Sequence, residues 1–298
     1  MPYRLIYNPT AGGGRAQRVV DRLTPRLADV DGLEVTATRE PGHAVELARA
    51  VSDQEGLTVI SVGGDGTHHE VVNGLLPGGR ARLAIIPAGS GNDFAGSLNI
   101  PNDPTEALSV ALGDSFRFLD IGAAELTDGT HYFLTVTGAG FDAEVAALLN
   151  SRPKGRGSGS LLYLRGIIET LLRYQCEPMA VESPSWSANG PTLLVAVGNT
   201  PRYAGGIRIC PDATPDDGLF EVVWIRGMGR LRVLSILARA YQGTHVRHAL
   251  VETRMVDTLS LSGPSHLSVH ADGEILGHLP ATIRVVPAAL PVLCPAAR

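Results

Sequence analysis

Three glycine-rich turns in the first third of the chain could bind phosphate groups. They are Asn8–Gly14 (NPTAGGG), Gly63–Thr67 (GGDGT) and Pro87–Asp93 (PAGSGND), and each follows an apolar run and precedes a helical pattern. Glycines let backbone N–H groups come close to an anion, and a helix N-terminus adds partial positive charge. One such turn could be a plain connection, whereas three together favour a phosphate or nucleotide site.

Two carboxylates in these turns indicate a metal ion beside the phosphates. Asp65 and Asp93 would repel a polyphosphate unless a divalent cation lay between them, and Mg²⁺ is typically held by one or two carboxylates, phosphate oxygens and water. The turns contain no lysine and match no Walker A loop, and GAGFDA at Gly138–Ala143 comes too late in the chain for a Rossmann fingerprint. We therefore expect a Mg²⁺–nucleotide complex that is held in a different way.

Three possible metal ligands follow the second turn: His68, His69 and Glu70. Helical geometry excludes a shared metal site for them. Consecutive helical residues point about 100° apart, so the three side chains cannot converge on one ion. We expect His68 and His69 to be exposed. Glu70 lies one turn after Gly66 and could face the binding crevice.

Two acidic turns in the second half of the chain could also carry chemistry. Asp272 and Glu274 flank a glycine, share one face if the segment is extended, and could accept a proton from a hydroxyl group. The segment Asp216–Gly218 precedes a strand-like run, and a side-chain oxygen with nearby carbonyls is the ligand set of a hard cation. From these residues alone, an ordinary turn is favoured for Asp272–Glu274 and stays open for Asp216–Gly218.

The elements that must position these turns alternate between strands and helices. Strands are expected at Arg4–Asn8, Leu33–Thr38, Leu57–Val62 and Arg82–Pro87, and helices at Ala16–Val30, Ala44–Gln54, Thr67–Leu76 and from Pro104. Near-continuous apolar strands separated by helices predict a parallel sheet covered on both faces. The carboxyl ends of such strands form the binding crevice, so the three glycine-rich turns should lie along one edge of the sheet.

The pattern of the sequence changes after about Leu126. Short strand-like runs separated by turn residues predict a mostly antiparallel sandwich or distorted barrel, interrupted by helices at Ser160–Gln175 and Arg230–Gln242. The fold class is therefore α/β + β. Residues 1–125 form an N-terminal, three-layer, doubly wound nucleotide-binding domain, and residues 126–286 form a C-terminal β-sandwich domain.

Composition excludes several classes of protein. The chain has 298 residues and a formal net charge of −5, which argues against nucleic acid as the main partner. Its three cysteines have no paired spacing, so neither a disulfide framework nor a zinc site is expected. No signal-peptide pattern or membrane-spanning apolar run is present, and we expect a cytoplasmic protein.

One apolar and basic segment could rest on an anionic bilayer, although a core helix with a solvated cationic edge is an equal alternative. The segment is Ser160–Tyr174 (SLLYLRGIIETLLRY). The cations around it are Arg152, Lys154, Arg156, Arg165 and Arg173. A weaker patch consists of Arg226, Arg230, Arg232, Arg239 and Arg247.

Taken in order along the chain, these motifs resemble the diacylglycerol kinase catalytic family, which includes sphingosine, ceramide and bacterial lipid kinases. The resemblance runs through YNPTAGGG, GGDGTHHEVVNGLL, PAGSGNDFA, GAGFDAEV, GNTPRYAGG, CPDATPDDGLFEVV and HADGE. GGDGT alone is shared with NAD kinases and phosphofructokinases, whereas the series that ends in DDGLF and DGE is highly specific. The resemblance implies two domains, and it implies that the last segment, residues 287–298, returns to the first domain.

The resemblance also implies roles for individual residues. The ATP contacts would be Asn8, Pro9, Thr10, Ala11, Gly12, Thr38, Gly64, Asp65, Gly66, Thr67, His68, His69, Glu70, Ser90, Asn92 and Asp93. A structural Mg²⁺ ion would be held by the Asp217 side chain and the backbone carbonyls of Thr214 and Leu219, with Asp93 and Asp120 linked to it through water. The proton acceptor would be Asp272, with Glu274 beside it.

The sequence departs from the family pattern at two places. Ser90 replaces a threonine, which keeps the hydroxyl, and Gly42-His43-Ala44 lacks a carboxylate that the family often has on the nucleotide side. The predicted function is an ATP-dependent, Mg²⁺-requiring lipid kinase at a membrane surface, with diacylglycerol as the favoured substrate. The alternatives are another lipid alcohol, an NAD kinase-like enzyme and an inactive binding module, and a homodimer stays open.

Overall fold

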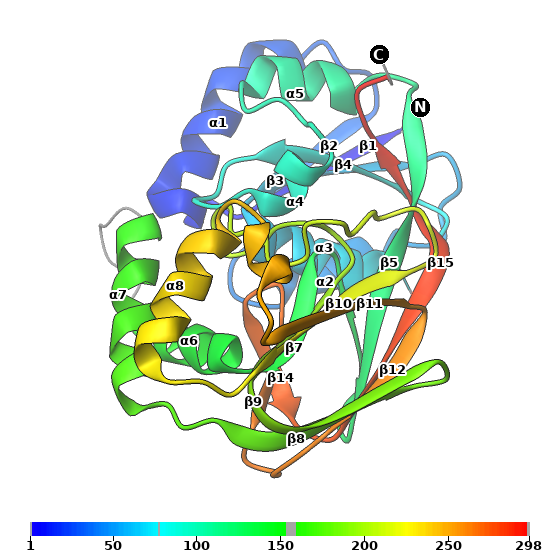
Figure 1. Cartoon of the computed structure of the whole chain (residues 1–298). Coiled ribbons are helices and arrows are strands. Elements are labelled where there is room, and N and C mark those ends of the chain that lie inside the picture. Colours follow the sequence, from blue (N-terminus) through cyan, green and yellow to red (C-terminus); the bar gives the residue numbers. More distant parts are fainter. Residues whose placement is uncertain (1, 77, 153–158, 297–298) are drawn as a thin grey trace. The chain divides into compact units, whose positions relative to one another are not determined.

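The computed structural model describes residues 2–76, 78–152 and 159–296, and it divides into two compact units (Figure 1). Unit 1 contains Met1–Asp120 and Ala288–Arg298, and unit 2 contains Ile121–Pro287. Two strands, β5 (Phe116–Leu126) and β15 (Ala281–Leu293), run from one unit into the other. Each unit has its own fold.

Unit 1 is a parallel sheet between two layers of helices, as the alternating pattern predicts. The sheet order is β4–β3–β1–β2, and the end of β15 joins β4 in parallel at Val292 and Leu83. Helices α1 and α5 lie on one side of these strands, and α2 and α3 lie on the other (Figure 1). The strands are β1 (Tyr3–Tyr7), β2 (Leu33–Ala37), β3 (Thr58–Gly63) and β4 (Arg82–Pro87). The helices are α1 (Ala11–Leu27), α2 (His43–Arg49), α3 (Asp65–Leu75), α4 (Asp93–Ser97) and α5 (Pro104–Ala111).

Helix α5 begins where the sequence has a start signal. The Asp103 carboxylate accepts hydrogen bonds from the backbone of Thr105 and Glu106, and Pro104 occupies the first turn of α5. All six residues of β3 are buried, because helices cover both faces of this strand. The three glycine-rich turns follow β1, β3 and β4 at the same edge of the parallel sheet.

Unit 2 is mostly antiparallel, and the predicted α/β + β fold class is confirmed. Its strands follow the order β14–β13–β7–β9–β8–β12–β15, and β10 pairs with both β9 and β11. The strands are β6 (Gly129–Phe133), β7 (Val136–Gly140), β8 (Glu177–Ser183), β9 (Trp186–Gly198), β10 (Phe220–Arg226), β11 (Val251–Val256), β12 (Thr258–Ser262), β13 (Ser268–Ala271) and β14 (Glu274–His278). The helical segments are α6 (Phe141–Asn150), α7 (Gly159–Arg173), α8 (Arg230–Ala240) and the 3₁₀ turn η1 (Thr244–Arg247).

Two hydrophobic clusters fill unit 2. One lies between strands and includes Phe133, which stacks on Phe220 with ring centroids 5.5 Å apart. The other lies under α6, α7 and α8 and includes Phe141 and Ile236. Helix α6 was not predicted from the sequence, because it is short and its apolar residues do not form a narrow stripe. Its buried apolar residues are Phe141, Ala143, Val145 and Ala146.

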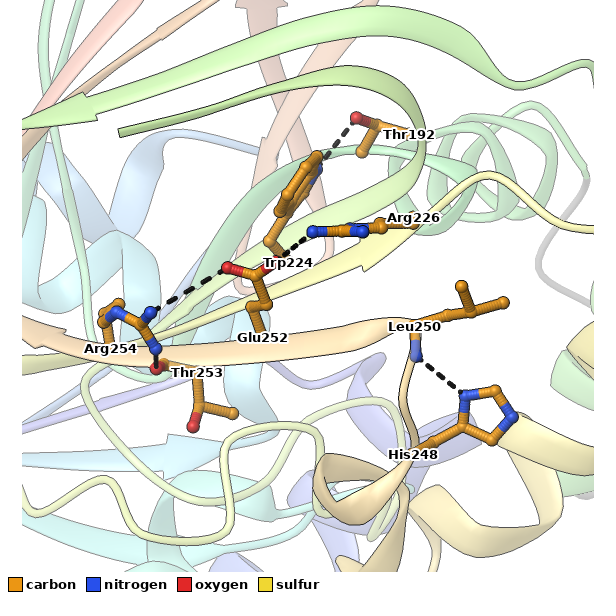
Figure 2. A network of polar contacts seen from close by, with 8 residues as sticks. All are labelled: Thr192, Trp224, Arg226, His248, Leu250, Glu252, Thr253 and Arg254. Atoms are coloured by element: carbon orange, nitrogen blue, oxygen red, sulfur yellow. Dashed lines mark hydrogen bonds and ion pairs between the residues drawn. The ribbon is translucent and has the colours of Figure 1, made fainter. Parts of the chain in front are cut away.

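Side chains of β10 and β11 form a network of polar contacts beside the first cluster (Figure 2). Glu252 pairs with Arg226 and lies 3.9 Å from the Nη2 atom of Arg254. The two arginines cover the rings of Trp224 and Trp186, and the Trp224 indole N–H donates to Thr192 at 2.9 Å. This network belongs to the scaffold of unit 2, because each member bonds to or covers a neighbouring strand residue.

Candidate functional site

The first glycine-rich turn has a backbone that only glycine adopts readily. Gly12, Gly13 and Gly14 have φ angles of 59°, 66° and 82°, so regular helix geometry begins only after them. The Asn8 side chain closes the turn by accepting hydrogen bonds from the Thr10 N–H and hydroxyl at 3.0 and 2.9 Å. Consecutive left-handed glycines before a helix leave a run of backbone N–H groups without bulky neighbours, which suits an anion.

The second and third turns touch each other through glycine. A Cβ atom on Gly64 would lie 2.9 Å from the Cα of Gly89, and one on Gly89 would lie 2.4 Å from the Cα of Gly64. A Cβ on Gly12 would lie 2.3 Å from the Ala88 carbonyl oxygen, which brings the first turn to the same place. The structure thus gathers the three turns, and it adds a reason for glycine here, which is the close packing of one turn on another.

Asp65 joins the second and third turns. Its carboxylate accepts hydrogen bonds from the backbone N–H groups of Asp93 at 3.2 Å and Phe94 at 3.1 Å, at the start of α4. Asn92, whose φ is 56°, accepts a bond from the Gly89 N–H at 2.8 Å. Asp65 therefore has a structural task in addition to the metal-linked one predicted for it, and Asp93 is itself buried.

The expectation that His68 is exposed is wrong. The side chain is fully buried, and its Nδ1 atom lies 2.8 Å from the Ser61 hydroxyl of β3. Burial lowers the pKa of His68 from 6.5 to about 3, because an imidazolium would lose its hydration there. The helical period explains the error: His68 follows Thr67 onto the face of α3 that packs on the sheet, whereas His69 is half-exposed. The His68 side chain is directed into the core, so a nucleotide contact of this residue would come from its backbone.

Glu70 supports a neighbouring helix. Its Oε2 atom accepts a hydrogen bond from the Ala44 N–H, 3.3 Å away, in the first turn of α2. The N-cap of that helix is Gly42, which has no side chain to cap it. Glu70 thus supplies a carboxylate beside Gly42-His43-Ala44, where the sequence itself lacks one. Of the other predicted contacts in unit 1, Thr38 is half-buried at the end of β2 and Ser90 is exposed in the third turn.

The carboxylate of Asp272 in unit 2 is held by three donors. Its Oδ2 accepts a hydrogen bond from the Leu134 N–H at 2.9 Å, and its Oδ1 accepts bonds from the Thr135 N–H at 2.8 Å and hydroxyl at 2.6 Å. Asp272 has a φ of 52° and Gly273 a φ of 88°, so the chain turns sharply there. Glu274 is exposed beside this turn. The donors fix the direction of the Asp272 carboxylate and stabilise its negative charge.

Several residues that support Asp272 carry no recognisable sequence signal. Thr135 is buried, and its carbonyl accepts hydrogen bonds from the backbone of Asn199 and Thr200. The Asn199 amide donates to the Leu134 carbonyl at 3.0 Å. These contacts join residues more than 60 positions apart in sequence, so no local pattern predicts them. The motif GNTPRYAGG is the one hint, since it contains Asn199.

A buried pair of polar side chains lies near the same turn. The His270 Nε2 atom is 3.0 Å from the Asp142 carboxylate, and both side chains are almost fully buried. The His270 ring also stacks on Tyr203, with centroids 6.1 Å apart. Asp142 and Tyr203 form the polar part of a cavity of about 20 Å³, whose other walls are apolar residues of α6, α7, α8, β9, β10 and the segment between β9 and β10. Sequence reasoning missed this pair, although Asp142 lies inside the motif GAGFDAEV.

The predicted metal residues of unit 2 lie in an exposed turn. The Asp217 side chain is exposed and accepts a hydrogen bond from the Leu219 N–H at 2.9 Å, which closes a tight turn around Gly218. Thr214 is exposed and precedes this turn. Over residues 2–76, 78–152 and 159–296, no group of three His, Cys, Asp or Glu side chains could hold a metal ion. An ion here would rely on one carboxylate, backbone carbonyls and water, which is a set that Mg²⁺ accepts.

Two further acidic residues, Glu221 in unit 2 and Asp120 in unit 1, are buried. Glu221 accepts a hydrogen bond from the Asp212 N–H at 2.7 Å, and desolvation raises its pKa from 4.5 to about 7. In unit 1, Asp120 is buried and accepts a hydrogen bond from the Ala288 N–H at 2.8 Å. Asp93 and Asp120, the two residues predicted to reach the metal through water, both belong to unit 1.

The predicted membrane segment forms helix α7, of which Ile167 and Leu171 are buried while Leu164, Ile168 and Leu172 are exposed. Its cationic character is reduced, because Glu169 pairs with both Arg152 and Arg165. Lys154 and Arg156 lie outside the described residues, and so do the side chains of Leu161 and Leu162. In the described part of the chain, no helix has the length and apolar character needed to cross a membrane.

Comparison with known proteins gives matches over both units. A family model described as "Diacylglycerol kinase catalytic domain" matches residues 2–124, and one described as "YegS C-terminal NAD kinase beta sandwich-like domain" matches residues 135–294. A "Probable lipid kinase YegS-like" from Chromohalobacter salexigens is 34% identical over 266 residues, which is 88% of this chain and 84% of the relative. A "Diacylglycerol kinase" from Staphylococcus haemolyticus is 30% identical over 282 residues, or 93% and 83% of the two chains.

The fold is also that of a solved structure. A "putative diacylglycerol kinase" from Bacillus anthracis superposes with a TM-score of 0.81, covering 99% of this chain and 97% of that one. At 24% identity this likeness supports the fold alone.

Proposed function

Because this chain belongs to the diacylglycerol kinase catalytic domain family, we propose that it transfers the γ-phosphoryl group of ATP to the hydroxyl group of a lipid, with diacylglycerol as the favoured acceptor. The observation that carries the proposal is the fixed carboxylate of Asp272, since a general base near the hydroxyl group assists phosphoryl transfer to an alcohol. The relatives named as diacylglycerol kinases favour the substrate.

The packed glycine turns of unit 1 support a nucleotide phosphate site. Backbone N–H groups at Gly12 and Gly13 and at the start of α3 would bind phosphate oxygens. The site would contain the sixteen residues from Asn8 to Asp93 named above, with His68 contributing its backbone. Asp65 would act by holding α4 against the second turn as well as by its charge.

Mg²⁺ fits the turn of Asp217. The exposed carboxylate there, fixed at one oxygen by the Leu219 N–H, resembles the single protein carboxylate of a hydrated magnesium site. The Asp217 side chain and the carbonyls of Thr214 and Leu219 would hold the ion, with Asp93 and Asp120 linked through water. When bound there, Mg²⁺ would have a structural role, and a separate Mg²⁺ ion that arrives with ATP would neutralise charge on the transferring phosphoryl group.

The lipid hydroxyl would be deprotonated by Asp272, and Glu274 would add a second carboxylate beside it. Leu134 and Thr135 hold the Asp272 carboxylate toward one direction, so that the base does not have to be ordered when the substrate arrives. The apolar cavity under α6, α7 and α8 would accept hydrocarbon from the lipid. It would have to open locally first, because its present volume is only large enough for about one water molecule.

The exposed apolar residues of α7 and α8 support docking on a bilayer. Leu172 and Leu231 are 63% and 84% exposed, and both helices contribute residues to the lining of the apolar cavity. Exposed apolar side chains on helices with flanking arginines suit the boundary of an anionic membrane. A lipid kinase must take its substrate from such a surface, so we place the enzyme at the periphery of the cytoplasmic membrane.

The test is a phosphorylation assay with labelled ATP and Mg²⁺ in mixed micelles. The panel contains diacylglycerol, phosphatidylglycerol, sphingosine, ceramide and a polyprenol, and the variants are Asp272→Asn and, as a control, Asp257→Asn. We expect diacylglycerol to be phosphorylated fastest and Asp272→Asn to lose at least about 100-fold in kcat, the usual contribution of a general base. Absence of phosphorylation across the panel would refute the kinase proposal, and a fully active Asp272→Asn enzyme would remove the base assignment.

A further inference from the structure

Helix α6 contacts the strand that leads into the turn Asp272–Glu274 from one end and the turn itself from the other. Its first turn contains Asp142, which pairs with His270 just before the turn. Its last residue is Asn150, whose amide donates to the Gly273 carbonyl at 2.9 Å and lies 3.5 Å from the Glu274 carboxylate. Helix α6 also packs on β13 and β14, the two strands that the turn connects (Figure 1).

We propose that α6 positions this turn, and that Asn150, Asp142 and His270 are positioning residues for Asp272 and Glu274. The inference rests on the proposed kinase function for its effect on turnover. The three residues act through the backbone of the turn, so none of them needs to touch the substrate. The turn requires such support, because its two central residues have positive φ angles and the register of β13 and β14 shifts between Val269 and His270.

The contact at the start of α6 fixes the strand that leads into the turn. The Oδ1 atom of Asp142 accepts a hydrogen bond from the Ala143 N–H at 3.0 Å, within the first turn of α6. The Oδ2 atom of the same carboxylate faces His270. The His270 carbonyl accepts a bond from the Thr137 hydroxyl at 2.7 Å, and its ring rests on Tyr203. His270 is therefore held on both ring and backbone, two residues before Asp272.

The contact at the end of α6 fixes the turn itself. Asn150 donates to a backbone carbonyl between the two acidic residues, and it is exposed, so changing it should not disturb the core. Because Asp272 is bonded to Leu134 and Thr135 on its other side, the turn lies between two anchors. Loss of the Asn150 anchor frees the Gly273 carbonyl while leaving the bonds to Asp272 in place.

The experiment compares Asn150→Asp, Asn150→Gln and Ser151→Ala with the wild-type enzyme. Asn150→Asp keeps the size of the side chain and replaces its N–H donors with an acceptor. Asn150→Gln keeps the donors on a longer side chain, and Ser151→Ala removes a hydroxyl that donates to the Leu148 carbonyl at the end of the helix. We expect Asn150→Asp to lower kcat about tenfold with an unchanged KM for ATP, Asn150→Gln to restore part of the loss, and Ser151→Ala to match wild type.

A second measurement keeps the inference separate from the kinase proposal. Hydrogen exchange of the peptide that spans residues 270–276 should accelerate in Asn150→Asp, with the rest of unit 2 unchanged, whether or not a lipid substrate has been found. Asp142→Asn should accelerate the same peptide. Equal exchange and a kcat within twofold of wild type in Asn150→Asp would overturn the inference. If the wild-type enzyme phosphorylated no lipid, the kinase proposal would fail, and equal exchange alone would then overturn the positioning role.

Discussion

The buried imidazole of His68 gives unit 1 a defined sensitivity to acid. The folded protein holds this ring neutral, with a pKa of about 3 against 6.5 in an unfolded chain. Between these two values the unfolded state binds a proton that the folded state rejects, so stability falls as the pH falls. The contribution is fully present above about pH 6.5 and is lost progressively on the way to pH 3.

The expected size follows from the difference between the two pKa values. At pH 5.5 the unfolded ring is about 90% protonated and the folded ring is neutral, which costs about 1.4 kcal/mol relative to pH 7.5. The perturbation that isolates this term is His68→Gln, because glutamine is neutral at every pH and can still bond to the Ser61 hydroxyl. The variant should therefore lose about 1.4 kcal/mol less than wild type when the pH is lowered.

The assay is urea unfolding followed by circular dichroism at the two pH values. The matched control is His69→Gln, which removes the next imidazole along α3 and leaves His68 in place, so it should keep the wild-type loss. The comparison uses the difference between pH values, so the cost of placing glutamine in the core cancels. An equal loss in wild type and His68→Gln, within about 0.3 kcal/mol, would refute the view that this ring is buried and neutral.

Three further predictions concern the turns of both units. Gly89→Ala should destabilise the protein by about 2 kcal/mol and weaken ATP binding at least tenfold, because its Cβ would overlap Gly64. The control is Gly229→Ala, whose Cβ would have no atom within 4 Å, and calorimetry should show that it binds ATP as wild type does. Thr135→Val should lower kcat about fivefold in the micelle assay, since it removes the hydroxyl bonded to Asp272 and keeps the backbone donor; an unchanged kcat would contradict this. Glu221 has a raised pKa, so its contribution to stability is present below pH 4.5 and is lost as the pH rises to about 7. In urea unfolding with EDTA, wild type should therefore lose up to about 3 kcal/mol of unfolding free energy between pH 5 and pH 8, and Glu221→Gln should not show this loss. Parallel plots of unfolding free energy against pH for the two proteins would count against the assignment.

The fold could be predicted from local patterns. The apolar runs Leu57–Val62 and Arg82–Pro87 became the buried parallel strands β3 and β4, because a strand covered on both faces has no polar side. Asp103 and Pro104 marked the start of α5 correctly. The short helix α6 was missed, since burial on most of its sides removes the amphipathic period that identifies a helix.

The candidate site could be predicted only in part. Motif order located the glycine turns, the Asp217 turn and the Asp272 turn, because each is a continuous stretch of sequence. The partners of those residues were not predictable: Asp272 bonds to Leu134 across 138 positions, and Asp142 bonds to His270 across 128. The burial of His68 was likewise missed, because the expected helix Thr67–Leu76 could be predicted from its pattern, but the face that places His68 against the sheet could not.

The sequence by itself determined that this protein has an α/β unit with three phosphate-type turns, a β-rich unit with two acidic turns, and the motif series of a lipid kinase family. These properties are encoded in short segments, where residue type and spacing act directly on the backbone. Only the tertiary structure decided that Gly64 and Gly89 pack on each other, that Asp65 caps α4, that Glu70 supports α2 and that α6 holds the Asp272 turn. Each of these depends on contacts between distant segments, which exist only after each unit has folded and placed those segments side by side.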